Sequence, residues 1–433
     1  MSRGTILDIF ESPTGTGYMW ETPKNCGASF PLASSVCSPY VFNQDALVST
    51  PDAPSSYANF STSTPLHTKP AAVVADLCSP FYIDRASTAS SADSPVSKVI
   101  LQALDKEGSR ILQRSLNGAP PEAIAVVVEE MLPHIQTVMC DTYANYMCQQ
   151  LFPCTSVTQR IKILYSLTPC FAAVARDRRG THSLQALLTL VDCDEERELV
   201  CRAVRGKAIQ LALDCHATHV LQQVLSCLGP NLVCGLMSEI VSGLGILAID
   251  QFGLGAVKRA IALAESCGFA VLLGSRLDDS LFQLVEDAYG NYSVQHAIEN
   301  WSKSPGSAGF PMARKMTLRL ADRLISLSSH KFASNVAETI IRVSDAALRY
   351  KLVKSLVVNP ETIAVMMRSP FPVFVVSTAL KYCPDAQLGL EVTSLISKHL
   401  ARLQQPEVKN RAKWEKLARG CSKWDPPCDQ EKR

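Results

Sequence analysis

One short phrase returns along this 433-residue chain at a nearly fixed interval, and it restricts the possible folds more than any other feature. We define the phrase as residues 109–113 and their counterparts, and we number its positions one to five. Position one is occupied in turn by Ser109, Asn145, Thr181, Thr218, Leu254, Asn291 and Ser334. Subtracting these numbers gives spacings of 36, 36, 37, 36, 37 and 43 residues. Such a period predicts a solenoid, in which each unit buries its apolar face only against its neighbours.

Positions three and four of the phrase are mostly apolar, as in Ile111 with Leu112 and Val220 with Leu221. Positions one, two and five share one side of a helix, because offsets of three and four residues return to the same face. The apolar pair is therefore expected to point into the stack, while the other three positions form a polar face. Gln stands at position five in five units, which is unusual for a purely structural helix and favours a binding surface.

The phrase resembles the repeats of the Pumilio, or PUF, family of RNA-binding proteins. Residues 287–296 and 331–338 are similar to the sixth and seventh repeats of that family, and residues 108–113 are similar to its first. The resemblance runs in family order from about residue 98 to about residue 400. It implies an all-α fold, a right-handed curved solenoid of about eight three-helix repeats with terminal caps, in which one repeat reads one RNA base.

Position two supplies side chains that can stack on RNA bases. Most of them are flat or cationic, and stacking of this kind contributes about 1–3 kcal/mol per base with little dependence on sequence. The stacking candidates are Arg110, Tyr146, His182, His219, Tyr292, Asn335 and Phe374.

Positions one and five supply side chains that can hydrogen-bond the edges of the bases. Guanine presents two adjacent donors that a carboxylate can accept, so Ser334 with Glu338 is expected to select guanine. A Gln amide suits adenine or uracil, and in the family adenine goes with Ser or Thr at position one and uracil with Asn. By this resemblance the adenine pairs are Ser109 with Gln113, Thr181 with Gln185 and Thr218 with Gln222, and the uracil pairs are Asn145 with Gln149 and Asn291 with Gln295.

Two units depart from the pattern. In the fifth, Gly255 at position two cannot stack, and Lys258 at position five is a point charge better suited to phosphate than to a base edge. In the eighth, Val373 at position one offers no hydrogen bond, and Pro372 stands where a helix is expected to begin. We expect little selectivity at the fifth unit, and the eighth either reads no base or mainly caps the stack. Because PUF proteins bind RNA antiparallel, the implied site is 5′-NGUNAAUA-3′.

By composition the chain divides into three parts. Residues 1–95 are rich in Ser, Thr, Pro and Ala, and we expect a low-complexity, mostly disordered region. Residues 96–405 are expected to form the repeat domain, and residues 406–433 a basic C-terminal tail. Its basic run from Lys409 to Arg419 either contacts RNA phosphate or forms a solvated helix, and we favour the solvated helix. The first part holds eight acidic and four basic residues, a net of −4, so the rest of this +2 chain carries +6. That mild excess favours reading through stacking and base edges over phosphate attraction.

We find no sequence motif of an enzyme or a metal site. The chain lacks a glycine-rich phosphate loop and a Gly-x-Ser-x-Gly elbow, and its 16 cysteines include no Cys-x-x-Cys, so we expect free thiols and no cofactor. His182 and His219 stand at position two and are expected to stack on bases rather than to exchange protons. No run is expected to reach the roughly 18–20 apolar residues of a membrane span, and the start lacks a secretory signal.

These observations favour a monomeric, cytoplasmic protein that binds single-stranded RNA at a UGU-containing element in mRNA 3′ untranslated regions. By the resemblance, it controls mRNA stability or translation together with protein co-regulators on its convex face. Two alternatives stay open: an RNA-binding scaffold in nucleolar ribosomal RNA maturation, and a helical-repeat adaptor between proteins that has lost RNA binding.

Overall fold

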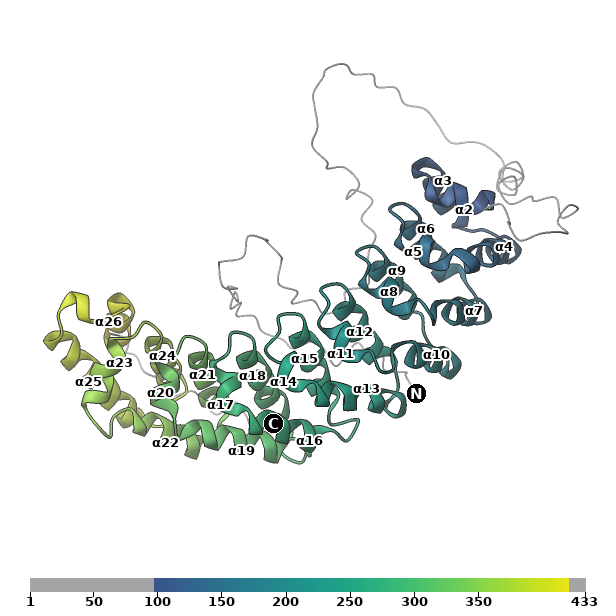
Figure 1. Cartoon of the computed structure of the whole chain (residues 1–433). Coiled ribbons are helices and arrows are strands. Elements are labelled where there is room, and N and C mark those ends of the chain that lie inside the picture. The colour runs from purple at the N-terminus through teal and green to yellow at the C-terminus, as the bar shows by residue number, and fades with distance from the viewer. Residues whose placement is uncertain (1–96, 420–433) are drawn as a thin grey trace, which may run out of the picture. The chain divides into compact units, whose positions relative to one another are not determined.

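The computed structural model describes residues 97–419, and every regular element in this range is a helix (Figure 1). The helices form eight units, each with a short helix, a helix that carries the phrase and an outer helix. The predicted all-α solenoid is thus confirmed. The prediction of disorder for residues 1–95 falls outside the described range.

Three rows of helices make up the units. The short helices are α2 (Lys98–Leu104), α5 (Ile135–Cys140), α8 (Phe171–Arg176), α11 (Ala208–Ala212), α14 (Leu244–Leu247), α17 (Leu281–Glu286), α20 (Leu324–Ser328) and α23 (Glu361–Met367). The phrase helices are α3 (Lys106–Leu116), α6 (Ala144–Leu151), α9 (Gly180–Leu188), α12 (Ala217–Cys227), α15 (Gly253–Leu263), α18 (Gly290–Trp301), α21 (Ala333–Val343) and α24 (Pro372–Lys381). The outer helices are α4 (Pro121–Met131), α7 (Val157–Leu167), α10 (Asp194–Val204), α13 (Pro230–Ser242), α16 (Ala270–Asp279), α19 (Phe310–Ala321), α22 (Ala346–Ser355) and α25 (Ala386–Arg402).

The phrase helices stack in chain order. Each contacts the next from α3 to α24, and together they line the concave side of the arc formed by residues 97–419 (Figure 1). The outer helices follow the convex side. Three 3-10 turns, η4 (Leu132–His134), η5 (Phe152–Cys154) and η6 (Gln405–Glu407), join helices at the edges of the units. Residues 302–309 connect α18 to α19 and account for the longer spacing of 43 residues there.

In most units, an aspartate four positions before position one caps the start of the phrase helix. The carboxylate of Asp250 accepts hydrogen bonds from the backbone N–H groups of Phe252 at 2.9 Å and Gly253 at 2.8 Å. These groups are donors that a helix leaves unpaired at its start, so the carboxylate stabilises the first turn. The same contact recurs at Asp105, Asp141, Asp177, Asp214 and Asp287. In the seventh unit His330 Nδ1 takes this role.

The apolar pair of the phrase packs between units, with one exception. Val220 and Leu221 are fully buried, as the pattern predicts. Ile111 at position three of the first unit is instead 43% exposed, so the prediction is wrong there. Position three faces the preceding unit: Ser183 Oγ donates to the backbone oxygens of Met139 and Asn145 in the second unit. Within residues 97–419 no unit precedes the first, so Ile111 lacks that neighbour.

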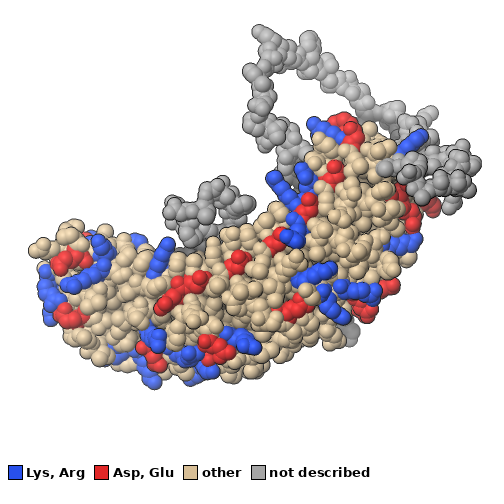
Figure 2. All heavy atoms as spheres, in the orientation of Figure 1, with Lys and Arg blue, Asp and Glu red and all other residues tan. Residues whose placement is uncertain are grey.

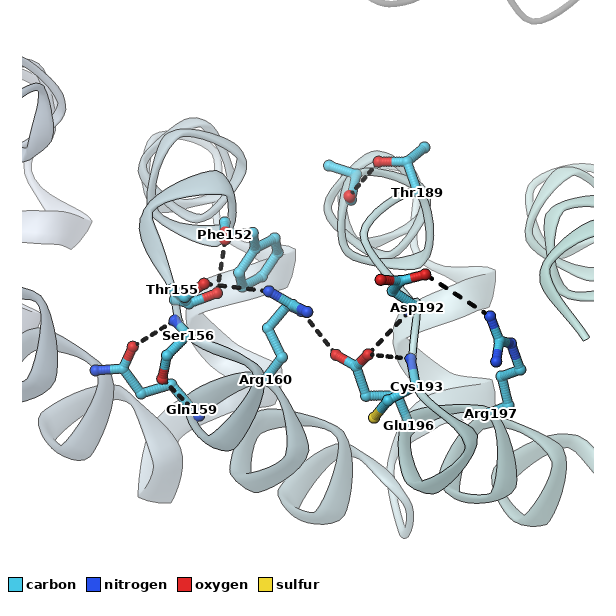
Figure 3. Close-up of polar contacts among 11 residues, drawn as sticks. Phe152, Thr155, Ser156, Gln159, Arg160, Thr189, Asp192, Cys193, Glu196 and Arg197 are labelled. Atoms are coloured by element: carbon cyan, nitrogen blue, oxygen red, sulfur yellow. Dashed lines mark hydrogen bonds and ion pairs between the residues drawn. The ribbon is translucent and has the colours of Figure 1, made fainter. Parts of the chain in front are cut away.

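Two neighbouring outer helices, α7 and α10, are joined by a buried ion pair. Arg160 of α7 contacts Glu196 of α10 at 2.7 Å, and Glu196 is fully buried (Figure 3). The second carboxylate oxygen of Glu196 accepts from the backbone N–H groups of Asp192 and Cys193. Burial would raise the pKa of Glu196, but these hydrogen bonds and the Arg160 guanidinium hold it below its ordinary value. Glu196 therefore joins two units and the start of its own helix.

The last unit is covered by a further helix, α26 (Arg411–Arg419), which packs on α24 and α25. The sequence predicts a solvated helix here, and that prediction is wrong because Trp414 is fully buried. Arg411 also donates to the backbone oxygens of Leu400 and Leu403, which would otherwise be unpaired at the end of α25. Residues 420–433 of the predicted tail fall outside the described range.

One described stretch, Pro121–Cys140, is long and apolar enough to cross a membrane, so the expectation that no run reaches this length is wrong. The stretch comprises α4, η4 and α5. Its side chains Val127, Val128, Met131 and Val138 are buried in the core of residues 97–419. Its apolar composition is accounted for by packing within the first two units.

Candidate functional site

Position one of the phrase is nearly buried in every unit that is predicted to read a base. Ser109, Thr181 and Thr218 donate their hydroxyls to backbone oxygens of the following unit, at 2.8, 3.1 and 3.1 Å. Asn145 and Asn291 instead donate Nδ2 to two backbone oxygens in the turn before their own helix. Ser334 bonds the backbone oxygen of Lys331 at 3.3 Å. In three of the six units position one therefore also fixes the junction to the following unit.

Position five is held by position one of the same helix. In each Gln unit, Nε2 lies 2.8–3.4 Å from the side-chain oxygen at position one; the pairs are Gln113 with Ser109, Gln149 with Asn145, Gln185 with Thr181, Gln222 with Thr218 and Gln295 with Asn291. In four of the five units Nε2 also lies 3.2–3.3 Å from the backbone oxygen of position one, so the amide nitrogen is held within its own helix. The two positions that sequence reasoning assigns to one base are thus brought together.

Glu338 differs from the other residues at position five. One of its carboxylate oxygens accepts a 2.7 Å hydrogen bond from Thr378 Oγ1, which lies in the next unit. Burial raises the pKa of Glu338, while Thr378 and Arg342 act in the opposite direction. The carboxylate is therefore a partly buried acceptor whose charge depends on these two neighbours. Sequence reasoning missed Thr378, because the contact joins residues 40 apart.

Position two is at least partly exposed in every unit that is predicted to read a base. Tyr146 is 37% exposed, and His182 and His219 are also exposed. The pKa of both imidazoles is lowered, first by partial burial and then by neighbouring basic groups that include His216. At neutral pH they are therefore uncharged rings, which suits stacking. Arg110, Tyr292 and Asn335 are partly exposed, and Arg110 also pairs with Glu107 at 2.9 Å.

The fifth unit lacks a stacking side chain, and its neighbour occupies the space. A Cβ atom at Gly255 would lie 2.6 Å from Gln222 Nε2, so the Gln222 amide packs directly on the glycine. Lys258 at position five is exposed. The absence of a side chain at position two of the fifth unit therefore allows the Gln222 amide of the fourth unit to pack closely there.

The eighth unit is partly covered by α26. Pro372 is the first residue of α24, where its missing N–H costs no helical hydrogen bond, so the helix forms despite the proline. Val373 is buried, and Phe374 is 41% exposed. Lys413 of α26 places Nζ 3.9 Å from the centre of the Phe374 ring. Beside this ring lies a pocket of about 510 Å³ between α24, α25 and α26. The stacking position of the last unit thus already faces a cation of the chain itself.

The described residues contain no cluster of His, Cys, Asp and Glu suited to a metal ion. The cysteines in this range are free thiols; Cys148 and Cys201 are buried, and Cys140, Cys227 and Cys234 are partly buried. The surface seen in Figure 2 mixes basic and acidic side chains over the whole stack.

Comparison with known proteins finds matches to this repeat. A family model described as the Pumilio-family RNA binding repeat matches residues 98–132, 134–168, 207–241, 280–304 and 323–357. A Pumilio domain-containing protein of Schizosaccharomyces pombe is 27% identical over 304 residues, which cover 69% of this chain and 43% of that protein. Pumilio homolog 12 of Arabidopsis thaliana is 25% identical over 292 residues, covering 66% and 47%. The chain spans about half the length of these curated relatives.

Solved structures show the same fold. The Puf4 RNA binding domain, bound to the HO endonuclease RNA 3′ UTR recognition sequence, has a TM-score of 0.67 and 23% identity, covering 77% of this chain and all of that domain. PUF-8 in complex with PBE-RNA has a TM-score of 0.63 and 20% identity, covering 74% and 92%. The matched family ranges correspond to units one, two, four, six and seven of the solenoid.

Proposed function

Because this chain belongs to the Pumilio family of repeat proteins, we propose that it binds single-stranded RNA in a sequence-specific manner, one base per unit along the concave face. The observation that carries this proposal is the shared geometry of six units. In each, positions one and five of the phrase share one helix face, a hydrogen bond joins them in the five Gln units, and position two is at least partly exposed. The assignment of bases rests on the residues at these positions.

The chemistry at position five favours different bases in different units. A Gln amide can present its carbonyl oxygen and, by turning about its contact with position one, an N–H to a base, which suits the donor and acceptor pair of adenine. Gln295 is more constrained than the other Gln residues at position five, because its Oε1 also lies within hydrogen-bond distance of the Thr339 hydroxyl. Its remaining acceptor capacity suits the N3–H group of uracil. Glu338 can accept both donors of guanine.

The proposed site is 5′-NGUNAAUA-3′, with the first and fourth bases unread. Gly255 and Lys258 of the fifth unit offer neither a stacking side chain nor an amide. Lys413 already covers the Phe374 ring of the eighth unit. We place the site in mRNA 3′ untranslated regions and propose a cytoplasmic, monomeric regulator of mRNA stability or translation that acts without an enzymatic step and recruits protein co-regulators.

The direct test is fluorescence anisotropy of the full chain with UGUAAAUA and with ACAAAAUA at one stated salt concentration. We expect the second RNA to bind at least tenfold more weakly, which corresponds to about 1.4 kcal/mol. Equal weak binding of both RNAs would contradict sequence-specific reading. That outcome would favour a protein–protein adaptor that has kept the fold, whereas equal tight binding would favour an RNA-binding scaffold.

A further inference from the structure

The residue that follows the phrase, which we call position six, contacts the preceding unit. Thr378 at position six of the eighth unit donates its hydroxyl to Glu338 Oε2 at 2.7 Å. The hydroxyl of Thr339 at position six of the seventh unit lies 3.2 Å from Gln295 Oε1 and 3.1 Å from the backbone oxygen of Asn335, and its one hydrogen is shared between these two acceptors. In both cases the contact reaches the position-five side chain that the proposed function assigns to a base. The two hydroxyls therefore lie behind the reading groups of units seven and six.

Hydroxyls at this place occur only behind these two units of the described stack. Behind units one to five, position six of the following unit holds Gln150, Ala186, Gln223, Arg259 and His296. The two Thr residues thus stand behind the side chains proposed to select guanine and the uracil that follows it. Those are the two read bases of the UGU element.

A hydroxyl donor changes what a partly buried carboxylate can do. The bond fixes one oxygen of Glu338, so the plane of the carboxylate is set before any base arrives. Each carboxylate oxygen has a further lone pair, so both oxygens remain able to accept the two donors of guanine. Burial disfavours the charged form and raises the pKa of Glu338, and the Thr378 hydrogen bond opposes that effect.

Few other charged groups act on this carboxylate. On its own helix α21, Arg342 lowers the pKa of Glu338, but Arg342 also pairs with Glu299 of α18. The only charged residue of α24 is Lys381, which lies over the Tyr382 ring. On α18 the other titratable group besides tyrosine is His296, whose basic neighbours are Lys258 and Lys303. Thr378 is therefore the one hydroxyl that contacts the carboxylate directly from the neighbouring unit.

We propose that Thr378 is a specificity-determining residue, which positions the Glu338 carboxylate of the preceding unit for guanine without contacting the base itself. The inference rests on the proposed function, because it names the residue that prepares one of its reading groups. It also makes the selectivity of the seventh unit depend on a residue of the eighth, a unit that by its own phrase reads no base.

The test compares Thr378→Val, which keeps the shape and removes the hydroxyl, with Thr378→Ser, which keeps the hydroxyl. Anisotropy of the full chain with UGUAAAUA and UAUAAAUA, from pH 5 to pH 8, gives the preference for guanine over adenine at the second base. We expect Thr378→Val to reduce this preference at least fivefold at neutral pH and to move its loss on acidification to higher pH. Thr378→Ser should retain both, and Thr189→Val, which removes an exposed hydroxyl of the third unit, should leave the guanine preference unchanged.

A second readout does not depend on RNA. In the free full chain, ¹³C NMR of labelled glutamate carboxyls follows the titration of Glu338, and the proposal expects a higher pKa in Thr378→Val than in the wild type or in Thr378→Ser. If the wild type shows no guanine preference but this shift is seen, the proposed function fails and the positioning of Glu338 stands. An unchanged titration, or a Thr378→Val variant with the wild-type preference and pH profile, overturns the inference.

Discussion

At the scale of single residues, the polar atoms of the phrase serve two purposes. Position one fixes the junction to the next unit or its own turn, and it also orients the amide at position five. Thr218, for example, donates to the backbone oxygen of Phe252 and accepts from Gln222. A substitution at position one should therefore change both stability and base preference. Position five is the cleaner place to alter base preference alone.

The pKa of His296 gives a prediction for stability. Burial, followed by the nearby Lys258 and Lys303, lowers this pKa to about 4, whereas an unfolded histidine titrates near 6.5. The unfolded chain therefore takes up a proton at higher pH than the folded chain does. The free energy of unfolding should fall between about pH 6.5 and pH 4, by up to about 3 kcal/mol from this group. Urea unfolding of the wild type and His296→Gln across this range should show a smaller decrease in the variant, and parallel curves would contradict the assignment.

Gly255 gives a prediction that crosses from one unit to another. Because a Cβ at this position meets the end of the Gln222 side chain, Gly255→Ala should displace that amide. We expect a several-fold weaker preference for adenine at the fifth base, with an unfolding free energy changed by less than about 1 kcal/mol. Gly235→Ala on the outer helix α13 is the matched control, since its Cβ would meet open space. An unchanged fifth-base preference would show that Gln222 does not read that base from its present position.

At the scale of helices, the sequence predicts the phrase helices well, because their period and polar pattern are local. The spacing of position one locates the seven phrase helices between α3 and α21, and the apolar pair predicts which side of each is buried. The contacts of Thr378 with Glu338 and of Lys413 with Phe374 join residues about 40 positions apart, in neighbouring elements. No local pattern indicates such pairs. The local pattern likewise predicts a buried Ile111, because it carries no information on whether a unit precedes the first one.

The buried ion pair between α7 and α10 should be costly to break. Removing one partner leaves an unpaired buried charge, so Glu196→Ala is expected to lower the free energy of unfolding by about 3–5 kcal/mol. Glu195, which is exposed on the same helix, is the control, and its substitution by Ala should change stability by no more than about 0.5 kcal/mol. The measurement is chemical denaturation followed by circular dichroism. Equal small effects of the two substitutions would mean that Arg160 is stabilised by other groups.

Helix α26 should control access to the Phe374 ring. In the wild type, Lys413 covers this ring, so an RNA that lacks the first base, GUAAAUA, should bind about as tightly as UGUAAAUA. Lys413→Ala should free the ring for stacking, which is worth about 1–3 kcal/mol. The ratio of the two dissociation constants should then rise about fivefold or more. Because the loss of the lysine charge affects both RNAs, the ratio isolates stacking, and an unchanged ratio would contradict a blocked eighth unit.

At the scale of the whole stack, the account claims that position along the solenoid sets position along the RNA. Ser334 with Glu338 near one end is proposed to read the second base, and Ser109 with Gln113 near the other end to read the eighth. Both pairs have Ser at position one and differ only at position five. Exchanging the two position-five residues should therefore exchange the proposed base preferences, while position one remains Ser in both units.

The most direct measurement is the affinity of Glu338→Gln and Gln113→Glu for RNAs that carry guanine or adenine at the second and at the eighth base. The account predicts that Glu338→Gln changes the second-base preference from guanine to adenine, and that Gln113→Glu changes the eighth-base preference from adenine to guanine. Each change is expected to be at least tenfold, within the roughly 1–3 kcal/mol of a good base contact. If either variant weakened all the RNAs equally, or altered the preference at the opposite end, the proposed reading of one base per unit would be contradicted.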